Sequence, residues 1–181
     1  MKMKPNRHVI KIISGAVGVL LLLMVVAFIG IQFIAVDQSN PPVLHEPAWD
    51  SPQTQALMDR ACYDCHSNQT AWPWYSNVAP ASWLVARHVH EGRAALNFSE
   101  WGLSKGQGET EAEEDEAREK AEGRESETEE IIEEISEGGM PPKSYLLLHP
   151  GARLSDTEMA TLISGLKATF GPGAEGALKG N

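Results

Sequence analysis

The pentapeptide Cys62-Tyr63-Asp64-Cys65-His66 constrains this chain more than any other stretch, and it holds the only two cysteines in 181 residues. Two thiols three positions apart on one turn can each bond to a vinyl group of the same haem. The histidine that follows then lies against the porphyrin as an axial ligand of the iron. The motif therefore predicts one covalent haem c, with thioethers from Cys62 and Cys65 and with His66 as the proximal iron ligand.

Three other interpretations of the cysteine pair are open at this stage. A thioredoxin-like redox pair lies at the start of a helix after a buried strand, and no β-α-β pattern of valine and isoleucine precedes Cys62. A zinc site needs about four ligands, so histidines at no recognised spacing would have to join the cysteines. A structural disulfide across two intervening residues is usually strained. Haem c is favoured over all three.

An uncharged run, residues 12–31, precedes the motif by some thirty positions. Twenty helical residues at about 1.5 Å each span a hydrocarbon core of roughly 30 Å. A cleaved signal peptide would have a shorter apolar core ending in small residues, whereas this run continues to Val36 without such a site. We therefore expect an uncleaved transmembrane anchor over residues 12–36.

The charges on either side of the anchor predict its orientation. Asp37 follows it, and four basic residues precede it: Lys2, Lys4, Arg7 and Lys11. Positive charge stays in the cytoplasm, so residues 1–11 are expected to be a cytoplasmic tail and everything after the anchor to lie outside. Haem c is attached outside the cytoplasmic membrane in bacteria, which agrees. The expected location is the bacterial inner membrane, single-pass, with the haem domain periplasmic or otherwise extracytoplasmic.

The rest of the chain predicts a small all-α domain. Residues 37–50 are a proline-rich linker, 51–170 the c-type haem domain, and 171–181 a flexible glycine-rich tail. Ser51-Pro52 begins a helix that delivers Cys62 near its end, and Pro80 opens a second helix to about Gly92. Capping boxes predict two further helices, from Ser126 to Gly138 and after Ser155.

An acidic tract interrupts this domain. Residues 109–137 hold fifteen acidic side chains against three basic ones, which accounts for more than the whole net charge of −10. The insert 106–125 has almost no large apolar residue and cannot bury a face, so it is either a solvated helix or disordered. A calcium site and a docking surface for a basic partner are the functional alternatives.

The sixth ligand of the iron has several candidates. Met140 stands between two glycines and two prolines and before the terminal helix, and a methionine in that position is the favoured distal ligand. The alternatives are His88, His90, His149 and an open site. Trp72, Trp74 and Tyr75 form an ordered loop around Pro73 that either packs a core or walls the haem. Arg87 and Arg93 either pair with haem propionates or are solvated.

With these residues the chain resembles the haem-binding domain family of the cytochrome c superfamily, whose members are typically single-domain and membrane-anchored. The likeness covers roughly residues 40–166, and the acidic tract departs from it. It implies covalent haem through Cys62 and Cys65, with His66 and Met140 on the iron. The matching runs are Asn40-Pro41-Pro42-Val43, Cys62-Tyr63-Asp64-Cys65-His66-Ser67-Asn68, Trp72-Pro73-Trp74-Tyr75, Ser82-Trp83-Leu84-Val85, Glu91-Gly92-Arg93, Leu96-Asn97-Phe98-Ser99-Glu100-Trp101, Met140-Pro141-Pro142 and Leu148-His149-Pro150 with Ala152-Arg153-Leu154-Ser155.

These features predict a mono-haem electron carrier and not an enzyme. A redox protein is the expected partner beside the cytoplasmic membrane, and no nucleic acid is expected. The acidic tract would steer a basic partner at low ionic strength. A haem-based sensor with a displaceable sixth ligand, or a peroxidase or oxidase accessory with an open iron, are the alternatives.

Overall fold

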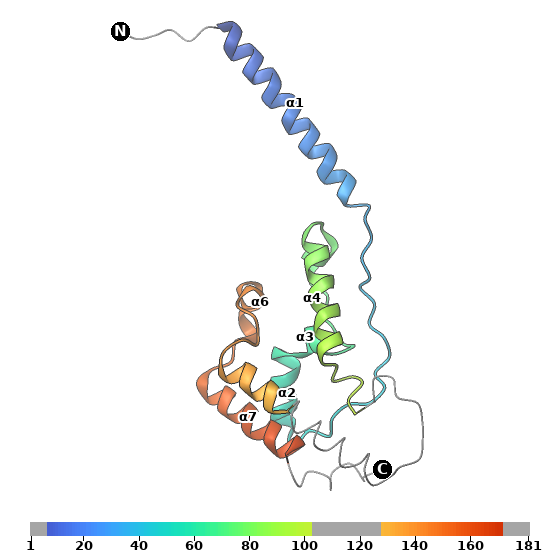
Figure 1. Cartoon of the computed structure of the whole chain (residues 1–181), viewed down its shortest axis with the longest axis vertical. Coiled ribbons are helices and arrows are strands. Elements are labelled where there is room, and N and C mark those ends of the chain that lie inside the picture. Colours follow the sequence, from blue (N-terminus) through green and yellow to red (C-terminus); the bar gives the residue numbers. More distant parts are fainter. Residues whose placement is uncertain (1–6, 103–127, 172–181) are drawn as a thin grey trace, which may run out of the picture. The chain divides into compact units, whose positions relative to one another are not determined.

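The computed structural model describes residues 7–102 and 128–171. Within these ranges the chain is helical and carries no β-strand (Figure 1). The acidic insert 106–125, the Ser126 capping box, residues 1–6 of the expected cytoplasmic tail and residues 172–181 of the tail lie outside the described residues. The chain divides into two compact units: residues up to Ser39 with Trp72–His88, and Asn40–Ala71 with the residues from Val89 onward.

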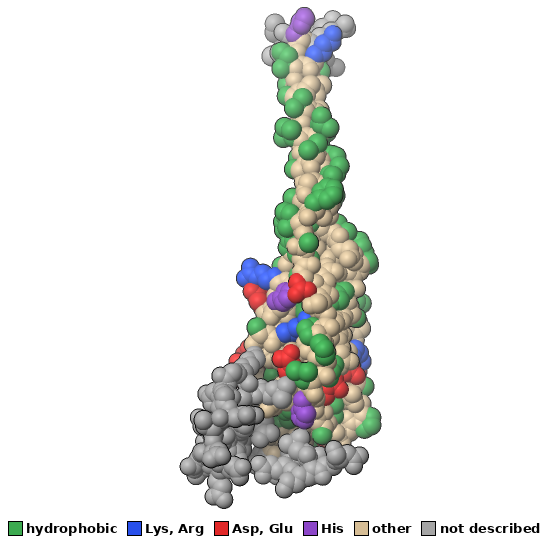
Figure 2. All heavy atoms as spheres, turned by 90° about the vertical axis from the view of Figure 1, so that its right-hand side faces the viewer, with side chains coloured by type: hydrophobic (Ala, Val, Ile, Leu, Met, Phe, Trp, Pro, Cys, Tyr) green, Lys and Arg blue, Asp and Glu red, His purple; other side chains and the backbone are tan. Residues whose placement is uncertain are grey.

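The first unit contains the apolar helix α1, Arg7–Ile31. Its stretch Ile10–Ile31 is long and apolar enough to cross a membrane, and none of it is buried within the protein. Figure 2 shows hydrophobic side chains along its length, with a histidine and a basic side chain at its N-terminal end. The unit also holds the 3₁₀ turn η1, Trp74–Asn77, and the first half of α4, Ala81–Ala95. The expected second helix is therefore present and continues past Gly92.

The second unit is built on α2, Pro52–Ala61, packed against α7, Asp156–Phe170 (Figure 1). Both begin as predicted. The Ser51 hydroxyl accepts from the Thr54 N–H, and Ser155 and Glu158 form a reciprocal capping box. Between them lie α3, Tyr63–His66, a helical segment at residues 128–136, α6, Lys143–Leu148, and η2, Pro150–Ala152.

Aromatic and aliphatic side chains from distant parts of the sequence make the core of this unit. The Phe98 ring stacks on Tyr63 and on Trp101, at centroid distances of 5.8 and 5.7 Å, and Trp101 stacks on Phe170 at 4.3 Å. Such ring pairs add about 0.5–1.5 kcal/mol each to the burial of their area. The buried members are Leu57, Met58, Tyr63, Phe98, Trp101, Ile135, Leu162 and Leu166.

Part of the expected linker also belongs to the second unit. His45 forms an isolated parallel bridge with Glu100, and its N–H donates to the Ser99 carbonyl at 3.1 Å. Trp49, four residues later, packs its ring on Phe98 at 5.7 Å and on Phe170 at 5.6 Å. Residues 45–49 are therefore packed against the domain, although the sequence predicted that they would only connect it to the anchor.

Close approach of α2 and α7 depends on Gly165. A methyl group there would overlap the Thr54 side chain, with the Thr54 Cγ2 at 2.7 Å and its Cβ at 2.9 Å. Because the Cβ itself is too close, a rotamer change of Thr54 cannot relieve the overlap, and the two helices must separate.

We expect Gly165→Ala to lower the free energy of unfolding. Overpacking costs about 1–3 kcal/mol, and the better helix propensity of alanine returns at most about 1 kcal/mol. Thermal or denaturant unfolding measures the difference. Gly151→Ala is the matched control, because nothing lies within 4 Å of a methyl group there. Equal stability of the two variants would contradict this account of the helix contact.

Candidate haem site

The Cys62-Tyr63-Asp64-Cys65-His66 motif begins where α2 ends. The Cys62 N–H still donates to the Met58 carbonyl at 2.8 Å, so it closes the last turn of α2. The Cys62 carbonyl then accepts from the N–H groups of Cys65 and His66, at 3.1 and 2.9 Å, and winds the motif into the single turn α3. Both cysteines are free thiols and both are half-buried. Two reduced sulfurs on one turn are the arrangement that covalent haem attachment requires.

The chemistry of the two thiols disfavours the competing interpretations. Burial, with a contribution from Cys65, raises the pKa of Cys62 to about 12. Burial, with a contribution from Asp64, raises the pKa of Cys65 to about 11. Redox-active pairs of the thioredoxin type depend on a lowered thiol pKa. Among the described residues, no group of three cysteine, histidine or acidic side chains could hold a metal ion by itself, so a zinc site has no ligand set there.

A backbone carbonyl fixes the orientation of the His66 ring. Its Nδ1 lies 3.1 Å from the Leu96 carbonyl, and because a carbonyl only accepts, Nδ1 carries the proton. The lone pair is therefore on Nε2, the nitrogen that can bind iron. Burial lowers the pKa of His66, against hydrogen bonds to the carbonyls of Leu96 and Gly92 that raise it. The ring is thus favoured in its neutral, metal-binding form at neutral pH.

Asp64, between the two cysteines, joins the turn to other elements. One carboxylate oxygen accepts from the Tyr145 hydroxyl of α6 at 2.6 Å, and the other accepts from the Ala71 N–H at 3.0 Å. The Asp64 carbonyl accepts from the Thr70 hydroxyl at 2.8 Å. Since α6 begins three residues after Met140, the Tyr145 bond ties the segment that follows Met140 to the turn that carries His66.

Arg93 has a structural role in this unit. Its guanidinium donates to the Ser67 carbonyl at 2.8 Å, the Asn40 side chain at 2.9 Å and the Thr70 hydroxyl at 2.8 Å. These bonds hold the segment that leaves His66. The sequence did not suggest this structural role for Arg93. The expected pairing of Arg93 with a haem propionate stays a prediction.

Gly92 brings α4 against the backbone of the motif. A methyl group at Gly92 would lie 2.5 Å from the Cys65 carbonyl oxygen and 3.1 Å from the Cys65 Cβ. Only glycine therefore permits this approach, which also places the Gly92 and Leu96 carbonyls at the His66 ring.

Met140 is 38% exposed, and its N–H donates to the Glu134 carbonyl at 3.2 Å. Leu147 and Leu148 of α6 are also exposed, Leu147 at 80%. His149, an alternative ligand, stacks on Tyr145 with ring centroids 4.0 Å apart. Its Nδ1 lies 3.2 Å from the Tyr145 carbonyl, to which it donates, and its part as an iron ligand stays a prediction.

The other expected pocket residues belong to the first unit. Trp74 is exposed, Trp72 and Tyr75 are half-buried, and the Trp74 and Tyr75 rings meet edge to face at 5.8 Å. Arg87 and the alternative ligand His88 are exposed on α4. Their parts in haem binding stay predictions. His90, on the second half of α4, is exposed.

Sequence reasoning missed the residues that position the motif: Leu96, Gly92, Asp64 and Tyr145. Gly92 and Leu96 act through their backbone atoms, and Asp64 is a single polar side chain inside the motif. Hydrophobic periodicity cannot reveal any of these roles. Glycine next to a conventional helix former in Glu91-Gly92-Arg93 was the one usable signal, because glycine in a helix interior costs about 1 kcal/mol unless something packs there.

Comparison with known proteins decides the family. A model of the haem-binding domain family matches residues 26–168. The chain belongs to this family. No curated protein and no solved structure matches the chain.

The residues of this haem-binding domain fit a haem. Two free thiols on one turn can form the thioethers, and burial lowers the pKa of His66 and so favours the neutral ring, whose lone pair is on Nε2 when Nδ1 donates to Leu96. The exposed apolar side chains Met140, Leu147 and Leu148 are of the kind that a porphyrin face covers. These side chains and the fixed turn belong to one unit of the protein.

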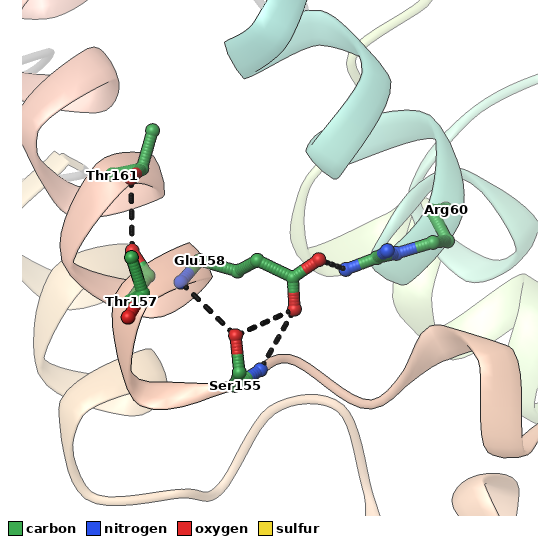
Figure 3. Close-up of polar contacts among 5 residues, drawn as sticks. All are labelled: Arg60, Ser155, Thr157, Glu158 and Thr161. Carbon is green, nitrogen blue, oxygen red and sulfur yellow. Dashed lines mark hydrogen bonds and ion pairs between the residues drawn. The ribbon is translucent and has the colours of Figure 1, made fainter.

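An ion pair outside this turn fixes α2, the helix that delivers Cys62. The Glu158 carboxylate accepts from Arg60 of α2 at 2.7 Å and from the N–H and hydroxyl of Ser155, each at 2.9 Å (Figure 3). The Ser155 N–H bond, followed by the Arg60 bond, lowers the pKa of Glu158 to about 2.

We expect the stabilisation by Glu158 to depend on pH. Because its pKa is lower in the folded protein than in the unfolded chain, the contribution is complete above about pH 4.5 and is lost as the pH falls toward 2. Glu158→Gln should therefore lower the melting temperature at pH 7 and have little effect near pH 2. Asp156→Asn removes the same charge from the same helical turn and is the control. A Glu158→Gln deficit that does not change with pH would refute the assignment.

Proposed function

We propose that this haem-binding domain is a mono-haem, c-type electron carrier with a small cytochrome c-like fold. The observation that best supports this is the His66 ring, held by Nδ1 with Nε2 left for iron, directly after two free thiols. The haem supplies a one-electron couple when it is bound. Cys62 and Cys65 hold it covalently, and His66 supplies the proximal ligand.

Met140 is the favoured sixth ligand. The Tyr145–Asp64 bond ties the segment after Met140 to the haem-binding turn, and the thioether is partly exposed. A methionine opposite histidine raises the reduction potential and closes the iron to exogenous ligands. Leu147 and Leu148 would exclude water from the porphyrin face. These features suit electron transfer better than binding of a substrate at the metal.

The carrier is anchored by α1 in the cytoplasmic membrane, with the haem domain on the outer face. The span Ile10–Ile31 and the basic residues before it support this arrangement. The partner would be another redox protein, and the acidic tract would favour one with a basic surface.

Two measurements on full-length protein from a host that matures c-type haem test this function. A haem stain after denaturing electrophoresis should be positive, because thioethers survive denaturation. Carbon monoxide added to the reduced protein at neutral pH should leave the spectrum unchanged. A colourless protein would refute haem attachment, and rapid binding of carbon monoxide would favour a sensor or a peroxidase-type accessory instead.

A further inference from the structure

The second stretch of the first unit, Trp72–His88, has an unusual composition. Residues 71–86 carry no charged side chain, and they include Trp72, Trp74, Tyr75 and Trp83. Tryptophan and tyrosine concentrate at the two surfaces of a bilayer, where an apolar ring with one polar group suits the headgroup region.

Hydrogen bonds hold this segment at the end of the membrane helix. The Gln32 side chain, one residue past α1, accepts from the Ala79 N–H at 2.9 Å and donates to the Ala79 carbonyl at 3.1 Å. The Gln38 amide donates to the Ser76 carbonyl. Ala79 is therefore fixed beside Gln32, and Ser76 is fixed beside Gln38.

The length of the span sets the depth of that level. The 22 residues of Ile10–Ile31 extend about 33 Å, slightly more than a hydrocarbon core of about 30 Å. With α1 in the bilayer, Gln32 reaches the edge of the core, and the bonded loop reaches it too. The exposed apolar side chains of this unit include Phe33, one residue after Gln32, at 84%, and Trp74, two residues before Ser76, at 79%.

We propose that residues 73–78, with Trp74 foremost, form a second membrane contact in the headgroup layer beside the outer end of α1. The partner is the lipid of the outer leaflet, because the loop is uncharged and aromatic and is hydrogen-bonded to Gln32, next to the end of α1. The proposal rests on the membrane anchoring in the proposed function. It gives Trp74 a lipid contact in place of the haem contact expected from the sequence.

Photo-crosslinking of full-length, haem-loaded protein in bacterial membranes tests the proposal. The variant Trp74→p-benzoylphenylalanine is irradiated, and phospholipid adducts are measured by mass spectrometry. Leu22→p-benzoylphenylalanine reports on the span, and Leu44→p-benzoylphenylalanine reports on an apolar position of the second unit that is 64% exposed. We expect phospholipid adducts at positions 22 and 74, and severalfold fewer at 44.

The possible outcomes distinguish a failure of the proposed loop contact from a failure of the proposed membrane anchor. Adducts at 22 but not at 74, or adducts of position 74 only with haem or protein, overturn the loop contact and leave the anchor intact. No adducts at 22 or 74 refute the membrane anchor itself. Equal yields at 74 and 44 indicate random collision with lipid and also overturn the proposal.

A second variant tests the bonds that carry the argument. Gln32→Leu removes the pair with Ala79 and places an apolar residue of similar size at the end of the span. It should lower the adduct yield at position 74 severalfold and leave the yield at position 22 unchanged. An unchanged yield at 74 would show that these bonds do not place the loop.

Discussion

Replacing Gly92 with alanine is expected to abolish most covalent haem incorporation. The new methyl group would lie 2.5 Å from the Cys65 carbonyl oxygen, and a backbone atom cannot move aside as the end of a flexible side chain can. Overpacking of this kind costs about 1–3 kcal/mol or more, above the roughly 1 kcal/mol that alanine returns in a helix. The overlap also forces α4 away from α3 and breaks the carbonyl bonds to His66.

Haem stain per unit of protein, measured in a maturation-competent host, is the readout. Gly151→Ala serves as control, because a methyl group there meets nothing within 4 Å and the substitution is chemically identical. If Gly92→Ala stained like the wild type, the close approach of α4 to the motif would not be what holds His66, and the site geometry would need another explanation.

The parts of this fold that sequence predicts are those whose causes are local. Ser51-Pro52 and Ser155-x-x-Glu158 begin helices because their caps act within three residues. The run 12–31 predicts α1 because it contains no charged residue and is almost entirely apolar over twenty positions. The turn from Cys62 to His66 follows from the motif itself.

The features that could not be predicted from the sequence depend on contacts between residues that are far apart in the chain. The Leu96 carbonyl accepts a hydrogen bond from His66, thirty positions earlier in the chain, and the composition of residues 92–96 does not predict this contact. The helix α6 is six residues long, too short for a periodicity. Trp49 lies in a proline-rich stretch that predicts a linker, yet it packs in the core because aromatic burial outweighs local preference.

Arg93 shows the same limit at the site. A basic residue near a haem motif predicts a propionate partner, because sequence reveals charge but not geometry. The structure supplies three other acceptors on Ser67, Asn40 and Thr70. The half-buried guanidinium bonds to the acceptors that the fold brings to it, which come from Asn40, 26 residues before His66, and from the loop that follows the motif.

Met140→Ala is expected to leave the haem attached and change its electronic state. The thioethers and His66 remain, so the haem stain should equal that of the wild type. The weak red-edge absorption band of sulfur-ligated ferric haem should disappear, the reduction potential should fall, and the reduced protein should bind carbon monoxide rapidly. Absorption spectra and a redox titration of the purified, full-length protein measure all three effects.

Two controls separate ligation from packing. Met159→Ala removes a thioether that is partly buried against the core of the same unit, so it should lower stability and keep the band. His149→Ala removes the alternative donor that stacks on Tyr145 and should also keep the band. If the band survived Met140→Ala, or if no band were present in the wild type and His149→Ala opened the iron, the sixth ligand would be reassigned. A sulfur ligand opposite His66 would then no longer support the carrier over the sensor.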